Sequence, residues 1–276
     1  MIFLWYFIFC YSLGFATTSI RQTEDYKNII EKAFNLSLQK EKFQALFILH
    51  QAYKNETAKK TAQQDIKSAF KKVSRLFLTE KAQQLYELAI SLAPTDNNQA
   101  LTKIIEALRE EPENFFLFLQ QARFLIAKGD CDAALEVLQK WKEFINLDAE
   151  LALVFAQTQV CLKKYKESDE VKKNNTESIK SSGLGIYWLL LDMLKSLEEK
   201  NRFAALDQLN AIRQNDKDYP ELYYWEWKMD FINKMNNKVA AENYQRRCSR
   251  LTAKTFRKYL FDPYLCRRIG EVQSAN

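Results

Sequence analysis

The sequence predicts an all-α fold, and three observations support this prediction. The 276 residues include only five Gly and four Pro, so tight turns and strand-breaking positions are few. Most segments are filled by Ala, Leu, Lys, Glu and Gln, which lose little side-chain freedom in a helix. Alanines and large apolar residues recur along the chain. Hydrophobic residues make up 47% of the chain, which is enough for a continuous core and argues against disorder.

The N-terminus has the character of a secretory signal. Residues 1–20 carry no charged side chain and begin with an unbroken apolar run. Gly14 and Ala16 place small residues three before and one before a cleavage point. We therefore expect residues 1–16 to be a signal peptide that is removed after Ala16. Because no basic residue precedes the apolar run, an uncleaved membrane anchor formed by residues 2–20 is the alternative.

Residues 17–78 are expected to form N-terminal helices. Phe43, Leu46 and His50 follow one another along a single helical stripe. These residues match the periodic pattern of the later segments poorly, so we treat residues 17–78 as divergent repeats.

The first clear helix pair is predicted at residues 79–93 and 97–111. Both segments carry the same series of two alanines, a large apolar residue between them and a proline, at Ala82, Tyr86, Ala89 and Pro94 and again at Ala100, Ile104, Ala107 and Pro112. Each proline ends its helix because it lacks the backbone donor that the next turn needs. The two series are about half a repeat apart, so they are read as the two helices of one antiparallel pair.

The next pair carries the most specific pattern. Over residues 115–148, Ala122 lies in the middle of a helix, Gly129 and Asp130 form a turn, and Ala134 lies in a second helix. Small residues at these places let two helices approach closely. The pattern resembles the tetratricopeptide repeat. This resemblance implies an α-solenoid of about five to six antiparallel helix pairs, wound as a right-handed superhelix.

The 34-residue period continues with lower fidelity. Ala156 takes the place of Ala122 within residues 149–182, and the series Ala204-Ala205-Leu206 repeats the start of an earlier second helix within residues 184–217. A last pair follows Pro220. We predict repeats over residues 79–237 and a basic capping helix and tail over residues 238–276.

The resemblance also implies where a partner binds. In solenoids of this kind, the first helix of each pair lines a concave surface. Counting from the matched alanines nominates the outward-facing positions Phe116, Leu119, Arg123, Leu153, Gln157, Tyr187 and Tyr223.

Four aromatic residues crowd into positions 223–227 and span more than one helical face. One face must pack in the core. The other either packs as well, under the next helices or the C-terminal tail, or provides binding anchors, with Trp227 among them.

The net charge of +6 resides in the C-terminal stretch. Residues 238–276 hold nine Lys and Arg against three Asp and Glu, and the preceding residues hold equal numbers of both signs. One helical face of this stretch is expected to carry Arg247, Arg250, Lys254, Arg257 and Lys258. This basic face is either the solvated side of a capping helix or a contact for an anionic membrane surface or an acidic partner. Nucleic acid is not an expected partner of an exported protein.

Four cysteines remain after removal of the signal peptide, and an exported chain meets an oxidising compartment. Cys131, Cys161, Cys248 and Cys266 form two bridges in one of three pairings, or stay as buried thiols. Cys131 and Cys161 would lie at the same edge of neighbouring repeats, which makes their bridge feasible. A bridge from Cys248 to Cys266 requires the chain to reverse near Pro263. No two cysteines have the spacing of a metal site.

Nothing in the sequence points to catalysis, a cofactor or a metal site. The one histidine, His50, lies in an apolar helical run and is expected to be a packed side chain. We expect an exported interaction module or scaffold of the cell envelope, periplasmic or secreted, that binds a peptide or protein partner on its concave face. The alternatives are contact with a membrane or acidic partner through the basic tail, and an all-helical glycan-acting enzyme with paired carboxylates in a deep pocket. The oligomeric state stays open.

Overall fold

The computed structural model describes residues 26–55, 60–232 and 237–274, and these residues form helices and turns without any strand. The predicted all-α fold class is therefore confirmed. The predicted signal peptide and its alternative, the anchor at residues 2–20, lie outside the described residues. Among those that are described, no helix is both long enough and apolar enough to cross a membrane.

The chain divides into two compact units. The first unit contains the residues up to Leu78, together with Glu113–Phe115. The second contains Thr79–Pro112 and the residues from Phe116 onwards. The change of unit after Leu78 falls where the sequence pattern changes, whereas residues 79–237 and the C-terminal stretch belong to the same unit.

The described residues of the first unit form three helices, at residues 26–38, α2 (Lys42–Asn55) and α3 (Lys60–Arg75). His50 is buried in α2, as expected for a packed side chain. The return of the chain at Glu113–Phe115 completes this unit. The Phe43 backbone N–H donates to Glu113 Oε2 at 3.1 Å, and the rings of Phe70 and Phe115 meet edge to face at 5.8 Å.

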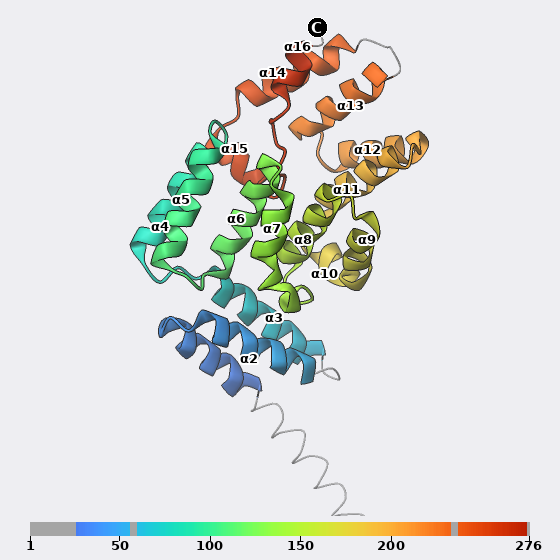
Figure 1. Cartoon of the computed structure of the whole chain (residues 1–276). Helices are drawn as coiled ribbons and strands as arrows, with labels where there is room; N and C mark the ends of the chain where they lie inside the picture. Colours follow the sequence, from blue (N-terminus) through green and yellow to red (C-terminus); the bar gives the residue numbers. More distant parts are fainter. Residues whose placement is uncertain (1–25, 56–59, 233–236, 275–276) are drawn as a thin grey trace, which may run out of the picture. The chain divides into compact units, whose positions relative to one another are not determined.

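The second unit is a succession of helix pairs (Figure 1). The pairs are α4 (Glu80–Leu92) with α5 (Asn97–Glu110), α6 (Phe115–Lys128) with α7 (Cys131–Gln139), α8 (Ala149–Cys161) with α9 (Tyr165–Asn174), α11 (Gly185–Glu198) with α12 (Arg202–Asn215), and α13 (Pro220–Ile232) with α14 (Lys238–Ser249). Short helices η1 (Lys142–Phe144) and α10 (Thr176–Ser181) lie between pairs.

Local sequence explains where these helices begin and end. Side-chain oxygens of Thr79, Asp96 and Asp148 accept hydrogen bonds from the first turns of α4, α5 and α8. Between α6 and α7, Gly129 has a φ of 88°, a left-handed conformation that costs glycine little. The chain reverses there, so α7 can follow α6 as its partner.

The repeated alanines are buried in this unit. Each has no exposed surface: Ala82, Ala89, Ala100, Ala107, Ala122, Ala134 and Ala156. A methyl side chain at a helix crossing keeps the two axes close, and large neighbours on either side fill the remaining space. The pairs α4 with α5, α8 with α9, α11 with α12, and α13 with α14 all pack directly on one another.

Two disulfides join elements of the second unit. Cys131 at the start of α7 is bonded to Cys161 at the end of α8, with 6.0 Å between the Cα atoms. Cys248 near the end of α14 is bonded to Cys266, with 5.4 Å between the Cα atoms. These are the two pairings that the sequence made geometrically reasonable. Two bridges suggest an oxidising, exported environment.

The C-terminal stretch differs from the single capping helix that the sequence predicts. The helix α14 ends at Ser249, and α15 (Ala253–Lys258) begins after a break at which Thr252 caps the new helix. We call residues 250–266 the strap. Within the strap, α15 packs against α4, which is the first helix of the second unit. After the strap, α16 (Ile269–Ser274) packs on α14 (Figure 1).

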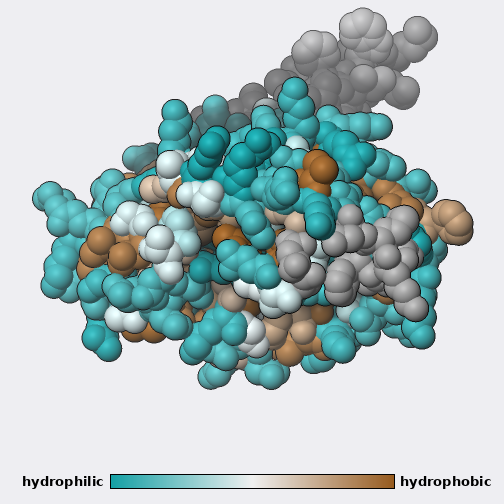
Figure 2. Space-filling view, turned by 90° about the horizontal axis from the view of Figure 1, so that it is seen from above, coloured by the Kyte–Doolittle hydropathy of each residue, from teal (hydrophilic) through white to brown (hydrophobic). Residues whose placement is uncertain are grey.

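The face of the molecule seen in Figure 2 is mostly polar. On the face shown in Figure 2, hydrophilic side chains predominate and apolar ones gather in separate groups. Among the described residues, the most exposed large apolar side chain is Phe203 at the start of α12, which is 84% exposed.

Candidate functional site

Most of the residues predicted to line an open concave face are buried. Six of the eight are at most 4% exposed: Leu119, Arg123, Leu153, Gln157, Tyr187 and Trp227. Only Phe116 and Tyr223 are partly exposed. Five of the seven positions expected to face outward are therefore buried, and Trp227, for which packing was one of the two alternatives, is buried as well. Leu153 belongs to the core around Trp188, and the ring of Trp227 packs 5.8 Å from that of Tyr224.

The strap covers three of these residues, which lie on three successive first helices of the pairs. Arg123 on α6, Gln157 on α8 and Tyr187 on α11 all contact it, and we call these three the inner-face residues. The guanidinium of Arg123 lies over the Phe261 ring, 5.2 Å from its centroid. Gln157 Nε2 donates to the Phe261 carbonyl at 2.6 Å, and the Tyr187 hydroxyl donates to the Lys258 carbonyl at 3.3 Å.

Arg123 is a buried cation without a carboxylate partner in the described part of the chain. It is 1% exposed, donates to the side-chain oxygen of Gln120, and has only the rings of Phe124 and Phe261 against its guanidinium. Burial lowers its pKa to about 10, and the nearby hydroxyls of Tyr86 and Tyr187 oppose this shift. The side chain therefore stays charged at neutral pH.

Three buried polar atoms around Phe261 have no hydrogen-bond partner among the described residues. They are Gln120 Nε2, Arg123 Nε and Gln157 Oε1. A buried polar atom that makes no hydrogen bond costs about 1–3 kcal/mol. The strap therefore satisfies the inner face only in part.

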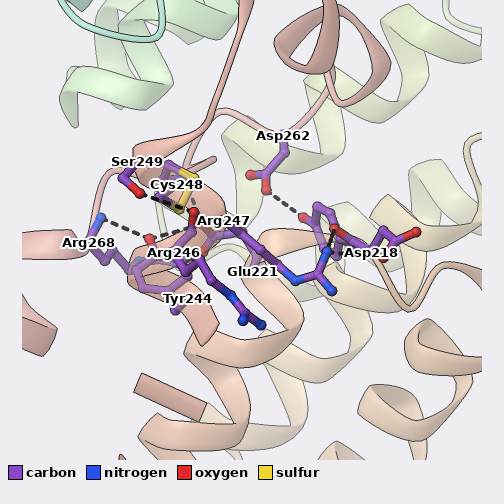
Figure 3. Close-up of a disulfide and its surroundings, with 11 residues drawn as sticks. Asp218, Glu221, Tyr244, Arg246, Arg247, Cys248, Ser249, Asp262 and Arg268 are labelled. Carbon is purple, nitrogen blue, oxygen red and sulfur yellow. Dashed lines mark hydrogen bonds and ion pairs between the residues drawn. A yellow bond between two sulfur atoms is a disulfide. The ribbon is translucent and has the colours of Figure 1, made fainter. Parts of the chain in front are cut away.

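The far end of the strap is held by a buried network at the last helix pair (Figure 3). Glu221 on α13 has no exposed surface, and its Oε1 accepts from the Cys266 backbone N–H at 2.7 Å and from the Tyr244 hydroxyl at 3.1 Å. Its Oε2 pairs with Arg268 at 2.9 Å. This network surrounds the Cys248–Cys266 disulfide and fixes the strap where it rejoins α14.

Asp262 is the second buried carboxyl of this region. It accepts from the Tyr219 hydroxyl (Figure 3) and from the Tyr264 backbone N–H at 2.8 Å. Burial raises the pKa of Glu221 to about 7, helped by the charge of Asp262 and opposed by Arg268. Burial also raises the pKa of Asp262. The two carboxyls are engaged by protein groups, and neither lines a described cleft.

The ligand atoms of Glu221, Cys248 and Cys266 lie within 4.8 Å of one another, the spacing of a metal site. In this structure the two sulfurs are bonded to each other. Metals bind the thiolate form of cysteine, so the disulfide leaves Glu221 as the one donor of this group.

The aromatic residues at positions 223–227 pack mainly under the C-terminal segment. Tyr224 and Trp225 are buried, and the guanidinium of Arg268 lies 4.7 Å and 4.9 Å from their ring centroids. Tyr223 stays partly exposed beneath Arg247, which lies 4.7 Å from its ring centroid.

The predicted continuous basic face does not form, because the helix is interrupted at residues 250–252. Three of its five residues pair with carboxylates of the same unit: Arg247 with Asp218 at 3.1 Å, Arg257 with Glu87, and Lys258 with Asp216 at 2.7 Å. Arg250 and Lys254 remain exposed.

A cleft of about 610 Å³ opens beside the inner face. Tyr187 and Trp188 of α11 form part of its wall, and Lys258 and Tyr259 of the strap form another part. The Trp188 indole N–H is buried and has no hydrogen-bond partner among the described residues.

Sequence reasoning found the inner-face residues but missed what covers them. Phe261 contacts Arg123 and Gln157 from more than a hundred positions away, and no local pattern links them. The one available signal was the spacing of Cys248 and Cys266, which brackets the strap.

No protein-family model matches the sequence, and no curated protein is similar to it.

Proposed function

We propose that this chain is an exported, tetratricopeptide-like interaction module and that its inner-face residues bind a peptide segment of a partner protein. Arg123, Gln157 and Tyr187 come from three successive helix pairs, which is the arrangement that a solenoid uses to line a binding groove. The proposed groove runs across α6, α8 and α11.

The way in which the strap binds carries this proposal. Gln157 and Tyr187 each donate a hydrogen bond to a main-chain carbonyl of the strap, three residues apart. Arg123 adds a contact with the Phe261 side chain. Contacts to main-chain carbonyls do not depend on the side chains of the bound segment, and a side-chain contact adds selectivity. These helices thus have the groups needed to hold a foreign peptide.

Export is part of the proposal. The apolar N-terminal run with small residues before Ala16 resembles a secretory signal. The two disulfides are favoured in an oxidising compartment. A periplasmic or secreted protein would meet both conditions.

Affinity capture from the compartment in which the protein resides tests this function. The bait is the mature chain, compared with Arg123→Ala/Gln157→Ala and with the matched control Arg109→Ala/Gln99→Ala, which alters the same residue types at exposed positions of α5, outside the inner-face helices and the strap. We expect the inner-face variant to lose most of the proteins captured by the wild type, and the control to keep them, as measured by quantitative mass spectrometry. Circular dichroism confirms that each bait is folded. Equal capture by all three baits would refute the proposed groove.

A further inference from the structure

One residue of the strap receives two of the three inner-face contacts. The Phe261 ring lies against Arg123, and the Phe261 carbonyl accepts from Gln157. The ring of Tyr187 also lies 6.3 Å from that of Phe261, in an edge-on arrangement. This part of the inner face therefore binds an aromatic side chain, through Arg123 and Tyr187.

Arg123 forms no ion pair among the described residues, although the negative charges of Asp262 and Glu150 act on it and favour its charged form. Arg123 is charged and buried, and the atoms Arg123 Nε and Gln120 Nε2 are donors without an acceptor in the described chain. A guanidinium binds a carboxylate through two parallel hydrogen bonds, which are stronger than those to neutral groups. The strap has a carboxyl at the next position, Asp262, but this group accepts hydrogen bonds from the Tyr219 hydroxyl and from the Tyr264 backbone N–H at 2.8 Å.

Residues 253–261 of the strap are held by the buried side chains of Phe256 and Tyr259, by a hydrogen bond from the Tyr259 hydroxyl to Asp216 at 3.0 Å, and by two ion pairs. The two ion pairs join Arg257 to Glu87 and Lys258 to Asp216. The Arg257 side chain is 43% exposed and the Lys258 side chain is 56% exposed. Ion pairs exposed in this way contribute little to stability. For residues 253–261 to move away, the contacts of Phe256 and Tyr259 and the two ion pairs must break, while the Cys248–Cys266 disulfide and the buried Asp262 stay in place.

From these observations, and on the basis of the function proposed above, we propose that the partner presents an aromatic side chain followed by a carboxylate and binds the inner face in place of the strap. The strap presents the same order in Phe261 and Asp262. In the partner, the carboxylate is free to pair with Arg123. The cleft lined by Tyr187 and Lys258 reaches one of the three inner-face residues, Tyr187.

A synthetic peptide tests the proposal directly. The probe is a fluorescent peptide with the sequence of residues 256–263, made in three forms: unchanged, with Ala in place of the second Phe, and with Asn in place of Asp. The proteins are the full mature chain with both disulfides intact, its Phe261→Ala variant, and the double variant Phe261→Ala/Arg123→Ala.

We expect the Phe261→Ala chain to bind the unchanged peptide about tenfold or more tighter than the wild type, because the strap then occupies the site in fewer molecules. The Ala and Asn peptides should bind this chain about tenfold more weakly than the unchanged peptide. In the double variant the unchanged and Asn peptides should bind equally, since the carboxylate acts through Arg123. Equal binding of these two peptides to the Phe261→Ala chain would overturn the proposed partner chemistry.

Two further measurements separate the inference from the function on which it rests. Saturating peptide should increase deuterium exchange at residues 253–261 of the wild-type chain. This measurement does not depend on the folding of any variant, and unchanged exchange despite binding would overturn displacement of the strap.

A peptide library is also selected on the Phe261→Ala chain. Binders that need Arg123 and Gln157 but lack the aromatic–acidic order would leave the groove standing and refute this inference. If exchange shows residues 253–261 released and no peptide binds, both proposals fail.

Discussion

At the scale of single residues, the second unit places charged groups where water cannot reach them. Arg123 is buried among aromatic rings, and Glu221 is buried beside one cation, Arg268, and a second carboxyl, Asp262. Removing an ion from water is costly unless its partners compensate. Glu221 has three such partners, whereas Arg123 has one amide and two rings. This difference is why we propose a binding role for Arg123, whereas Glu221 holds the strap through the Cys266 backbone N–H.

The raised pKa of Glu221 predicts how stability depends on pH. A carboxyl whose pKa is about 7 in the folded chain, against 4.5 as its ordinary value, binds a proton more tightly when folded. Stability is then greatest below pH 4.5 and falls as the pH rises towards 7, by about 1–3 kcal/mol. The raised pKa of Asp262 acts in the same direction. Thermal unfolding should therefore show a melting temperature that falls between pH 5 and pH 7.5.

The variant Glu221→Gln should flatten this dependence, because its side chain does not titrate. Glu242→Gln, at an exposed position on α14, is the matched control and should keep the wild-type profile. A profile that stays unchanged in Glu221→Gln would show that another group titrates.

At the scale of elements, the sequence was sufficient for the helix pairs and insufficient for the strap. Alanine spacing, prolines and the Gly129 turn act over a few residues, so the bounds expected for the pair at 79–111 differ from α4 and α5 by one residue or less. The strap depends on contacts between residues far apart in the chain. The basic pattern suggested one long helix, but the capping side chain of Thr252 starts a new one. Because the chain changes direction at this break, the strap covers the inner-face residues, and the sequence did not predict their burial.

Close packing of the α4–α5 pair can be tested by enlarging an alanine. Ala107 on α5 has no exposed surface. The change Ala107→Leu forces the helices apart, and overpacking of this kind typically costs about 1–3 kcal/mol. Arg109→Leu adds the same side chain at an exposed position on the same helix and should change the free energy of unfolding by about 0.5 kcal/mol or less. Urea denaturation compares the two, and equal effects would contradict a close crossing at Ala107.

At the scale of the whole molecule, the two disulfides constrain different parts of the second unit. The Cys131–Cys161 bridge joins neighbouring helix pairs, and the Cys248–Cys266 bridge closes the strap on itself. The separations are 30 and 18 residues. In the chain-entropy description both bridges stabilise by about 3 kcal/mol, and the longer loop contributes slightly more. Removal of the Cys131–Cys161 bridge should therefore lower the free energy of unfolding at least as much as removal of the Cys248–Cys266 bridge.

Their effects on the strap should differ. In Cys248→Ser/Cys266→Ser, one attachment of the strap is lost, so amide protection at residues 253–261 should fall towards that of an open segment while α4 and α5 stay protected. In Cys131→Ser/Cys161→Ser, which removes the longer loop, protection of the strap should stay close to that of the wild type under conditions where both variants are folded. Hydrogen exchange followed by mass spectrometry measures both. If the two variants expose the strap equally, its closure over the inner face depends on global stability and not on the bridge that brackets it.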